Sequence, residues 1–265
     1  MGILNVTPDS FYNGSRFEDD KAILAQTEKM LLEGAAIIDV GGYSTRPGAR
    51  DIPEEDELAR VIPAIRCIIR NFPGAAISID TFRSRIAEAA IGEGALLIND
   101  VSGGSDERMF GVAGSFGVPY VLMHMRGTPQ TMSAQTIYDH LIKDLMTYFQ
   151  TRISDLHSKG VKDIIIDPGF GFAKTASQSF DLLQHLDHFK FLGLPILAGL
   201  SRKSMIWKTL GVDAEKALNG TTTLNTIALL KGASLLRVHD VKEAVEVIKL
   251  IEHLPHAGSA SRSPV

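Results

Sequence analysis

Acidic and amide side chains in this sequence close short, mostly apolar runs, where they would stand at the ends of buried strands. Asp80, Asn99 and Asp167 each occupy such a position. Carboxylates accept hydrogen bonds and an amide both donates and accepts them, so the three side chains would suit a flat heterocycle with several N–H donors and a carbonyl. The pattern therefore predicts a binding site for a ring of that kind.

Cationic side chains are found at comparable positions. Lys203, Arg237 and His239 follow the last two apolar runs, and Arg46 lies in the loop after Asp39. Cations beside a strand-to-helix loop suit phosphate or carboxylate groups, and arginine can bind either with two parallel hydrogen bonds. A site that combines them with the acidic residues would take a substrate with a donor-rich ring at one end and anionic groups elsewhere.

Three other kinds of site are disfavoured by the spacing of their residues. The short G-x-G at Gly169 and Gly171 lacks the spacing of a dinucleotide fingerprint, and Ser201 does not lie in a nucleophile elbow. No Cys/His cluster has the spacing of zinc ligands. His124 follows a buried strand, and we interpret it there as a structural residue.

These polar residues are positioned by a chain in which short apolar runs alternate eight times with longer amphipathic stretches. The runs are continuously apolar, as expected where both faces of a sheet are buried. The clearest helical spacing of apolar residues covers Glu54–Phe72 and Val241–Leu250. The strands that we predict are Gly2–Val6, Ala36–Val40, Ala75–Ile79, Ala95–Asn99, Pro119–Met123, Asp163–Asp167, Pro195–Ala198 and Ser234–Val238.

Strand–helix alternation of this kind implies a parallel sheet with right-handed crossovers. Eight units favour an α/β fold, a single (β/α)8 TIM barrel of roughly 250 residues, and a doubly wound open sheet is the alternative. The carboxyl ends of the strands form the active-site face of such a barrel, which is where the polar residues above would gather. We expect the barrel to cover residues 1–253 and residues 254–265 to be a polar, disordered tail.

Composition bounds the partners and the compartment. The chain has 265 residues and a formal net charge of −4 at pH 7, with its charges spread along the sequence, so we expect no nucleic-acid partner. Its apolar runs are too short to span a bilayer, so we expect no membrane partner and read no signal peptide. Cys67 is the only cysteine, which excludes an internal disulfide and fits a cytoplasmic location.

Several of these segments occur together, and in the same order, in one known family. They are Met1–Phe11, Asp39–Ala49, Ser78–Thr81, Ile98–Asp100, Met123–Gly127, Asp167–Phe172, Ser201–Ser204 and Arg237–Glu243. With this set the chain resembles the dihydropteroate synthase family over residues 1–252. The resemblance implies a transferase of folate biosynthesis. Such an enzyme moves a 7,8-dihydropterin-6-ylmethyl group from its diphosphate ester to the amine of p-aminobenzoate, giving 7,8-dihydropteroate and pyrophosphate.

The resemblance also implies roles for individual residues, a magnesium ion and a homodimer. The pterin would be bound by Asp80, Asn99, Asp167 and Lys203. The catalytic residues would be Asp80, Lys203, Arg237 and His239. Asn5 would meet Mg²⁺. The diphosphate would be held by Thr45, Arg237, Val238 and His239, and the p-aminobenzoate pocket would be formed by Phe11, Arg46, Pro47, Phe172 and Ser201.

Three features depart from the family pattern. The chain begins inside the first predicted strand, so we expect its numbering to start after a trimmed N-terminus. Tyr43 stands where the family often has Glu, and Asn13 replaces the first residue of a common Asp-Gly-Gly.

The alternatives to this function are a pterin-dependent methyltransferase domain and a catalytically silent pterin-binding homologue. A methyltransferase domain needs no diphosphate site, so the presence of Arg237 and His239 argues against it. A silent homologue could lose Lys203, and this chain retains it.

Overall fold

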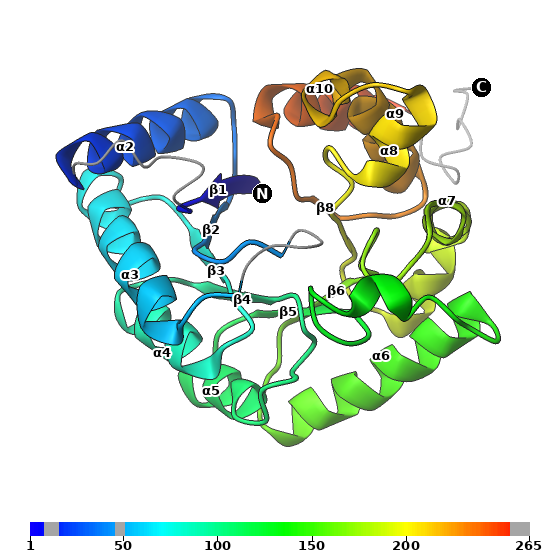
Figure 1. Ribbon diagram of the computed structural model, residues 1–265, viewed down its shortest axis with the longest axis horizontal. Coiled ribbons are helices and arrows are strands. Elements are labelled where there is room, and N and C mark those ends of the chain that lie inside the picture. Colours follow the sequence, from blue (N-terminus) through cyan, green and yellow to red (C-terminus); the bar gives the residue numbers. More distant parts are fainter. Residues whose placement is uncertain (8–15, 46–50, 255–265) are drawn as a thin grey trace, which may run out of the picture.

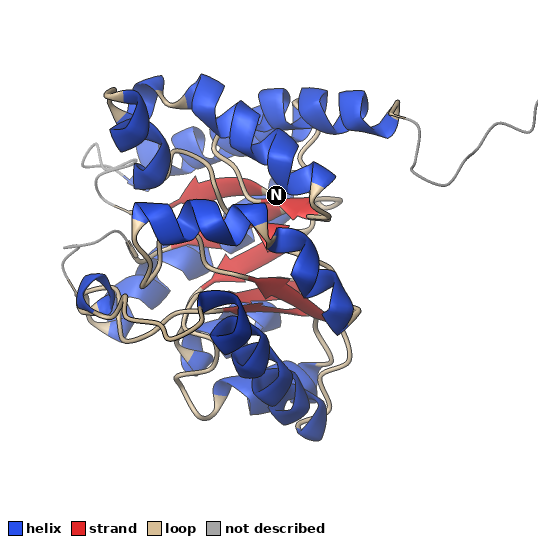
Figure 2. Ribbon diagram, turned by 90° about the vertical axis from the view of Figure 1, so that its right-hand side faces the viewer, coloured by secondary structure: helices blue, strands red, loops and turns tan. Residues whose placement is uncertain are grey.

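A ring of parallel strands enclosed by helices forms the computed structural model of this chain, which describes residues 1–7, 16–45 and 51–254 (Figure 1). The view from the side shows the helices outside and the strands within (Figure 2). The strands are β1 (Gly2–Asn5), β2 (Ile38–Gly41), β3 (Ile77–Asp80), β4 (Leu97–Asp100), β5 (Tyr120–Met123), β6 (Ile164–Asp167), β7 (Leu197–Ala198) and β8 (Leu235–Leu236). All eight predicted strands are present, which confirms their order along the chain.

Two stretches of sheet close into a barrel. Strands β1 to β6 pair in sequence order and all in parallel, and β7 pairs with β8. Single bridges join the two stretches, Ile166 with Ile196 on one side and Gly2 with Val238 on the other. At the second junction the Ile3 N–H donates to the Val238 carbonyl at 2.9 Å, and no sheet edge remains open there. The (β/α)8 barrel is confirmed over the open sheet.

The helices cover the outside of the barrel because each has one apolar face. In α3, for example, Pro53 precedes an acidic first turn that suits the helix dipole, and Val61, Ile65 and Ile68 are fully buried against the sheet. The α-helices are α2 (Arg16–Leu32), α3 (Glu54–Asn71), α4 (Ser84–Gly92), α5 (Met109–Phe116), α6 (Leu141–Ser158), α7 (Ala176–Gln184), α8 (Ser204–Leu210), α9 (Leu218–Leu230) and α10 (Val241–Glu252). Short 3₁₀ segments are η1 (Met132–Ala134), η2 (Leu186–Leu192) and η3 (Ala214–Lys216).

Several element boundaries differ from the prediction by one or two residues. Strand β3, predicted over residues 75–79, extends to Asp80, so this carboxylate lies within the strand and not after it. Strand β7 is shorter than predicted and begins after Pro195, which has no N–H to give to the sheet. Among the described residues no helix is both long and apolar enough to cross a membrane. The predicted tail, residues 254–265, lies outside the described residues except for its first.

The barrel interior is divided into an apolar floor and a polar upper layer. The floor is a cluster that includes Ile37, Leu97, Ile165 and Leu235. Side chains two residues apart in a strand share a face, so the positions two residues further on point into the same interior. Those positions are Asp39, Asn99, Asp167 and Arg237. The strand period alone therefore places four polar side chains above the apolar floor, at the carboxyl end of the barrel.

Candidate active site

Arg237 lies at the centre of the polar layer, just after β8. Its Nε donates to Asp39 Oδ2 at 2.6 Å, and its Nη2 donates to Asp80 Oδ2. Although burial opposes the charge, the carboxylates of Asp39 and Asp80 raise the pKa of Arg237 above its usual value. The guanidinium is therefore a permanent cation held by two strands from the opposite half of the chain.

Asp39 connects this cation to the predicted pterin residues. Its side chain is fully buried, and its Oδ2 also accepts a hydrogen bond from Asn99 Nδ2 at 3.0 Å. Its Oδ1 has no hydrogen-bond partner among the described residues. Asp39 falls inside the predicted strand Ala36–Val40, and no role was predicted for it. The signal was available, because a carboxylate inside a fully buried strand needs a partner.

The remaining charged members of the layer have shifted acidities. Burial raises the pKa of Asp80 to about 7, against the lowering by Arg237. Burial also raises the pKa of Asp167, although the Gly169 N–H donates to its Oδ1 at 2.8 Å. Burial lowers the pKa of Lys203 to about 8, partly opposed by the Asp167 carboxylate. The residues predicted to bind one ring thus lie in one electrostatically connected site, in which Asp80, Asn99 and Asp167 are buried and Lys203 is partly buried.

Phe172 and Ser201 lie at the border of this site. The Lys203 ammonium lies 4.0 Å from the centre of the Phe172 ring, a cation–π contact. Ser201 Oγ lies 2.9 Å from His239 Nδ1 and accepts from the His239 N–H at 3.2 Å. The structure therefore pairs Lys203, predicted for the pterin, with Phe172, predicted for p-aminobenzoate. It also pairs Ser201, predicted for p-aminobenzoate, with His239, predicted for the diphosphate.

Other predicted residues are placed as follows. Val238 is buried and uses its main chain to close the barrel, where its N–H donates to the Met1 carbonyl at 3.0 Å. Thr45 is partly buried in the loop after β2. Asn5 ends β1, and its Oδ1 and Asp80 Oδ2 would lie 3.6 and 3.5 Å from a Cβ on Gly41, so the two side chains flank this glycine. Phe11, Arg46 and Pro47, and the departure at Asn13, lie outside the described residues.

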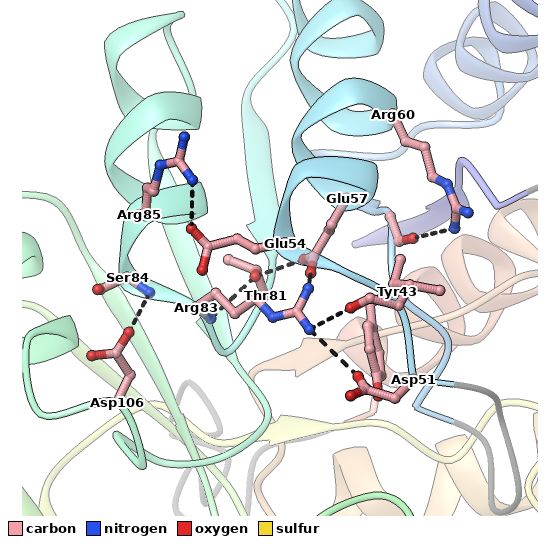
Figure 3. Close-up of polar contacts among 12 residues, drawn as sticks. Tyr43, Asp51, Glu54, Glu57, Arg60, Thr81, Arg83, Ser84, Arg85 and Asp106 are labelled. Atoms are coloured by element: carbon pink, nitrogen blue, oxygen red, sulfur yellow. Dashed lines mark hydrogen bonds and ion pairs between the residues drawn. The ribbon is translucent and has the colours of Figure 1, made fainter.

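A second polar network, centred on Arg83, supports the loop after β2 (Figure 3). Arg83 Nη1 donates to Glu57 Oε2 at 2.8 Å, and its Nη2 donates to the Ile52 carbonyl at 2.7 Å. Glu57 is fully buried and also accepts from Thr81 Oγ1 at 2.8 Å. Arg83 thereby ties the start of α3 to the end of β3. The sequence analysis did not identify this network.

Tyr43, which departs from the family pattern, belongs to the same network. Its hydroxyl donates to Asp51 Oδ1 at 3.0 Å and accepts from Gln130 Nε2 at 2.7 Å. Its ring packs edge-on against Phe82, with the centroids 5.0 Å apart. Tyr43 therefore links the loop after β2 to the loop after β5, a packing role that a Glu side chain would not supply.

Comparison with known proteins relates this site to one family. The sequence matches a family model described as pterin binding enzyme over residues 1–239. It is 41% identical over 254 residues to the dihydropteroate synthase of Escherichia coli (strain K12), which covers 95% of this chain and 90% of that protein.

Solved structures show the same relationship. The Yersinia pestis dihydropteroate synthase with a sulfonamide drug complex has a TM-score of 0.89 and 38% identity, covering 95% of this chain and 92% of that chain. The Xanthomonas albilineans dihydropteroate synthase with 4-aminobenzoic acid has a TM-score of 0.88 and 38% identity, covering 96% of this chain and 93% of that chain.

Proposed function

This chain belongs to the family of pterin-binding enzymes, as a dihydropteroate synthase, and from that premise we propose how its own residues carry out the reaction. The enzyme is a transferase of folate synthesis. It joins the 7,8-dihydropterin-6-ylmethyl group of a diphosphate ester to the amine of p-aminobenzoate, with release of pyrophosphate. One observation carries the assignment of the site, which is the layer of buried carboxylates and partly buried cations above the barrel floor.

The pterin ring is held by Asp80, Asn99, Asp167 and Lys203. Carboxylates accept from the N–H donors of the ring, and the Lys203 ammonium donates to its carbonyl. The same carboxylates favour the positive charge that develops on the pterin methylene as its C–O bond to the diphosphate breaks. This proposal is supported by the burial of Asp80, Asn99 and Asp167, because a charged group in a dry site is less screened by water, and by the partly buried Lys203, whose charge the Asp167 carboxylate favours.

The leaving diphosphate is held by Arg237 and His239, with Thr45 nearby. Arg237 uses Nε and Nη2 for Asp39 and Asp80, and its third nitrogen is Nη1. That atom is the one we assign to the diphosphate. The two carboxylates fix the guanidinium plane, so the donor is already oriented before the substrate arrives.

The second substrate occupies the border formed by Phe172 and Ser201, together with Phe11, Arg46 and Pro47 of the undescribed segments. Phe172 offers an apolar ring for contact with the benzene ring of p-aminobenzoate. The same Phe172 ring also contacts the Lys203 ammonium. The aniline nitrogen is neutral at pH 7 and already nucleophilic. The site therefore needs no strong general base for the attack on the methylene carbon.

Asn5 fits a magnesium ion. Mg²⁺ prefers oxygen ligands and is commonly bound by one or two protein oxygens together with substrate phosphates. Asn5 offers an amide oxygen beside Asp80, and no group of three His, Cys, Asp or Glu side chains among the described residues could hold a metal without a substrate. When bound there, the ion would neutralise charge on the departing diphosphate.

We also propose that the enzyme acts in the cytoplasm as a homodimer. A single cysteine, Cys67, supports a reducing compartment. The family relationship supports the assembly state.

The assignment of Lys203 predicts how pterin binding depends on pH. Because burial lowers the pKa of Lys203 to about 8, its ammonium loses a proton as the pH rises through that value. The affinity for pterin diphosphate should therefore fall by up to about tenfold for each pH unit above it. Lys203→Arg should remove this alkaline decline because arginine stays charged. Lys203→Met should lower the affinity at pH 7 by about 1.5–3 kcal/mol.

Titration calorimetry between pH 6.5 and 9.5 measures the affinity of the wild type, Lys203→Arg and Lys203→Met for pterin diphosphate. The assignment fails if wild-type affinity stays constant over this range, or if Lys203→Met binds as tightly as the wild type at pH 7.

A further inference from the structure

The ammonium of Lys174 is buried in the loop between β6 and α7, and the mechanism above gives it no role. Lys174 is only 7% exposed. Nζ lies 3.0 Å from the carbonyl oxygens of Gly169 and Phe172 and 3.0 Å from His124 Nδ1. Lysine is rarely buried so fully unless it is paired, so the burial of Lys174 calls for a structural or functional explanation.

The donors of Lys174 are all provided with acceptors. An ammonium group has three N–H bonds and no acceptor, and here three acceptors lie at 3.0 Å, with the His124 carbonyl oxygen farther away at 3.5 Å. His124 Nδ1 must accept, so its ring proton is on Nε2. Burial, with Lys174 and Arg126 nearby, lowers the pKa of His124 to about 2, which keeps the ring neutral. The ring is fixed by Tyr148, which packs edge-on at 4.8 Å between centroids.

The loop that Lys174 contacts is tightly turned, and the Tyr138 hydroxyl also holds it by donating to the Ala173 carbonyl at 2.9 Å. Gly169 and Ala173 have positive φ values of 72° and 47°, and a Cβ on Gly169 would lie 2.2 Å from the His124 carbonyl oxygen. The backbone therefore passes close to β5 and turns its carbonyls inward, toward Nζ. Without a donor in this position, the Phe172 carbonyl would lose its bond from Nζ in a buried site, and the Gly169 carbonyl would keep only the bond from the Phe172 N–H at 3.1 Å.

The same loop carries both pockets of the active site. At its start, the Gly169 N–H donates to Asp167, a proposed pterin ligand, at 2.8 Å. At its other end, the Phe172 ring lies 4.0 Å from the Lys203 ammonium and faces the proposed p-aminobenzoate pocket. The carbonyl of Phe172 is itself one of the acceptors of Lys174. A change at Lys174 would therefore be transmitted directly to the position of the Phe172 ring.

We propose that Lys174 and His124 form a positioning pair that holds the loop of residues 169–173 in place, with Phe172 set for p-aminobenzoate. The proposal rests on the proposed function of the Phe172 pocket. A purely structural purpose would be served better by an apolar side chain, because burial lowers the pKa of Lys174 to about 7 and so works against its charge. Groups kept in such an unfavourable state occur preferentially at functional sites.

The pair predicts a selective kinetic defect. Lys174→Met should raise the KM for p-aminobenzoate at least about tenfold, a change of about 1.4 kcal/mol, while the KM for pterin diphosphate changes less than about threefold. His124→Leu, which removes an acceptor, should behave likewise. His124→Asn should stay within about threefold of the wild type, because the asparagine oxygen can take the place of Nδ1. Lys162→Met, at an exposed position before β6, is the matched control and should change neither KM.

Hydrogen exchange without substrates provides a readout that does not depend on turnover. The amides of residues 169–173 should exchange at least about tenfold faster in Lys174→Met than in the wild type, while amides of the β1–β4 strands keep their rates. If the wild type makes no dihydropteroate, the proposed function fails, and the exchange experiment still tests the pair. The pair is overturned if these amides are unaffected, or if both KM values rise together in Lys174→Met and His124→Asn.

Discussion

Replacement of Arg237 by methionine is expected to lower kcat/KM for both substrates by about 10³-fold or more. Removing one preorganised charged donor from a transition-state site costs on the order of 10²–10³ in rate. Here the loss is larger, because Asp39 and Asp80 would remain buried without their cation. Steady-state kinetics and chemical denaturation of the same variant measure the effect on activity and on the free energy of unfolding.

A double variant separates the two effects. Asp39→Asn with Arg237→Met removes a buried charge of each sign, so it should recover part of the lost stability and none of the activity. Arg237→Lys keeps the charge but cannot reach Asp39, Asp80 and a diphosphate from one planar group, so a loss of at least tenfold is expected. An Arg237→Met enzyme within tenfold of wild-type kcat/KM would contradict this role.

Replacement of Arg83 by methionine is expected to lower the free energy of unfolding by about 3–5 kcal/mol, as for other broken buried pairs. Glu57 is fully buried and would lose its charged partner, although Thr81 would remain. Burial raises the pKa of Glu57, and Arg83 opposes that rise, so the variant would raise it further. The folded variant then binds a proton more tightly than the unfolded chain. Its stability should therefore fall as the pH rises above the usual pKa of a glutamate toward the higher pKa of the folded variant.

Urea denaturation at pH 5 and pH 7 tests this expectation. The deficit of Arg83→Met should be larger at pH 7, and Glu57→Gln in the same chain should reduce it. Arg66, whose pair with Glu93 is exposed, provides the control, and Arg66→Met should have a much smaller effect. Equal losses of unfolding free energy for Arg83→Met and Arg66→Met would show that the buried Arg83–Glu57 network stabilises the fold no more than an exposed ion pair does.

The architecture followed from local patterns, because each strand and helix buries an apolar face that the sequence displays. The strand period also placed Asn99 and Asp167 on the interior face. The last residue of each strand was harder to predict, because the hydrogen-bonded pairing between two strands stops where the neighbouring strand ends. Asp80, for example, lies inside β3 because it pairs with Asn99.

The partners of the charged groups could not be predicted in the same way. Arg237 and Asp39 are 198 residues apart, and Lys174 and His124 are 50 apart, so no local spacing reveals either pair. Arg237 was expected at the diphosphate, and the structure adds the two carboxylates that fix its plane. His124 was interpreted as structural, and its partner Lys174 was not considered at all.

We expect residues at the barrel mouth to join the two substrates, and formation of the product is the direct test. The purified chain is incubated with dihydropterin diphosphate and p-aminobenzoate, with Mg²⁺ or with a chelator. Dihydropteroate and pyrophosphate are measured in the same samples, and Arg237→Met serves as the inactive control. We expect equimolar dihydropteroate and pyrophosphate with Mg²⁺, and at least about tenfold less of both with the chelator. Absence of dihydropteroate from the wild-type reaction with Mg²⁺ would contradict it.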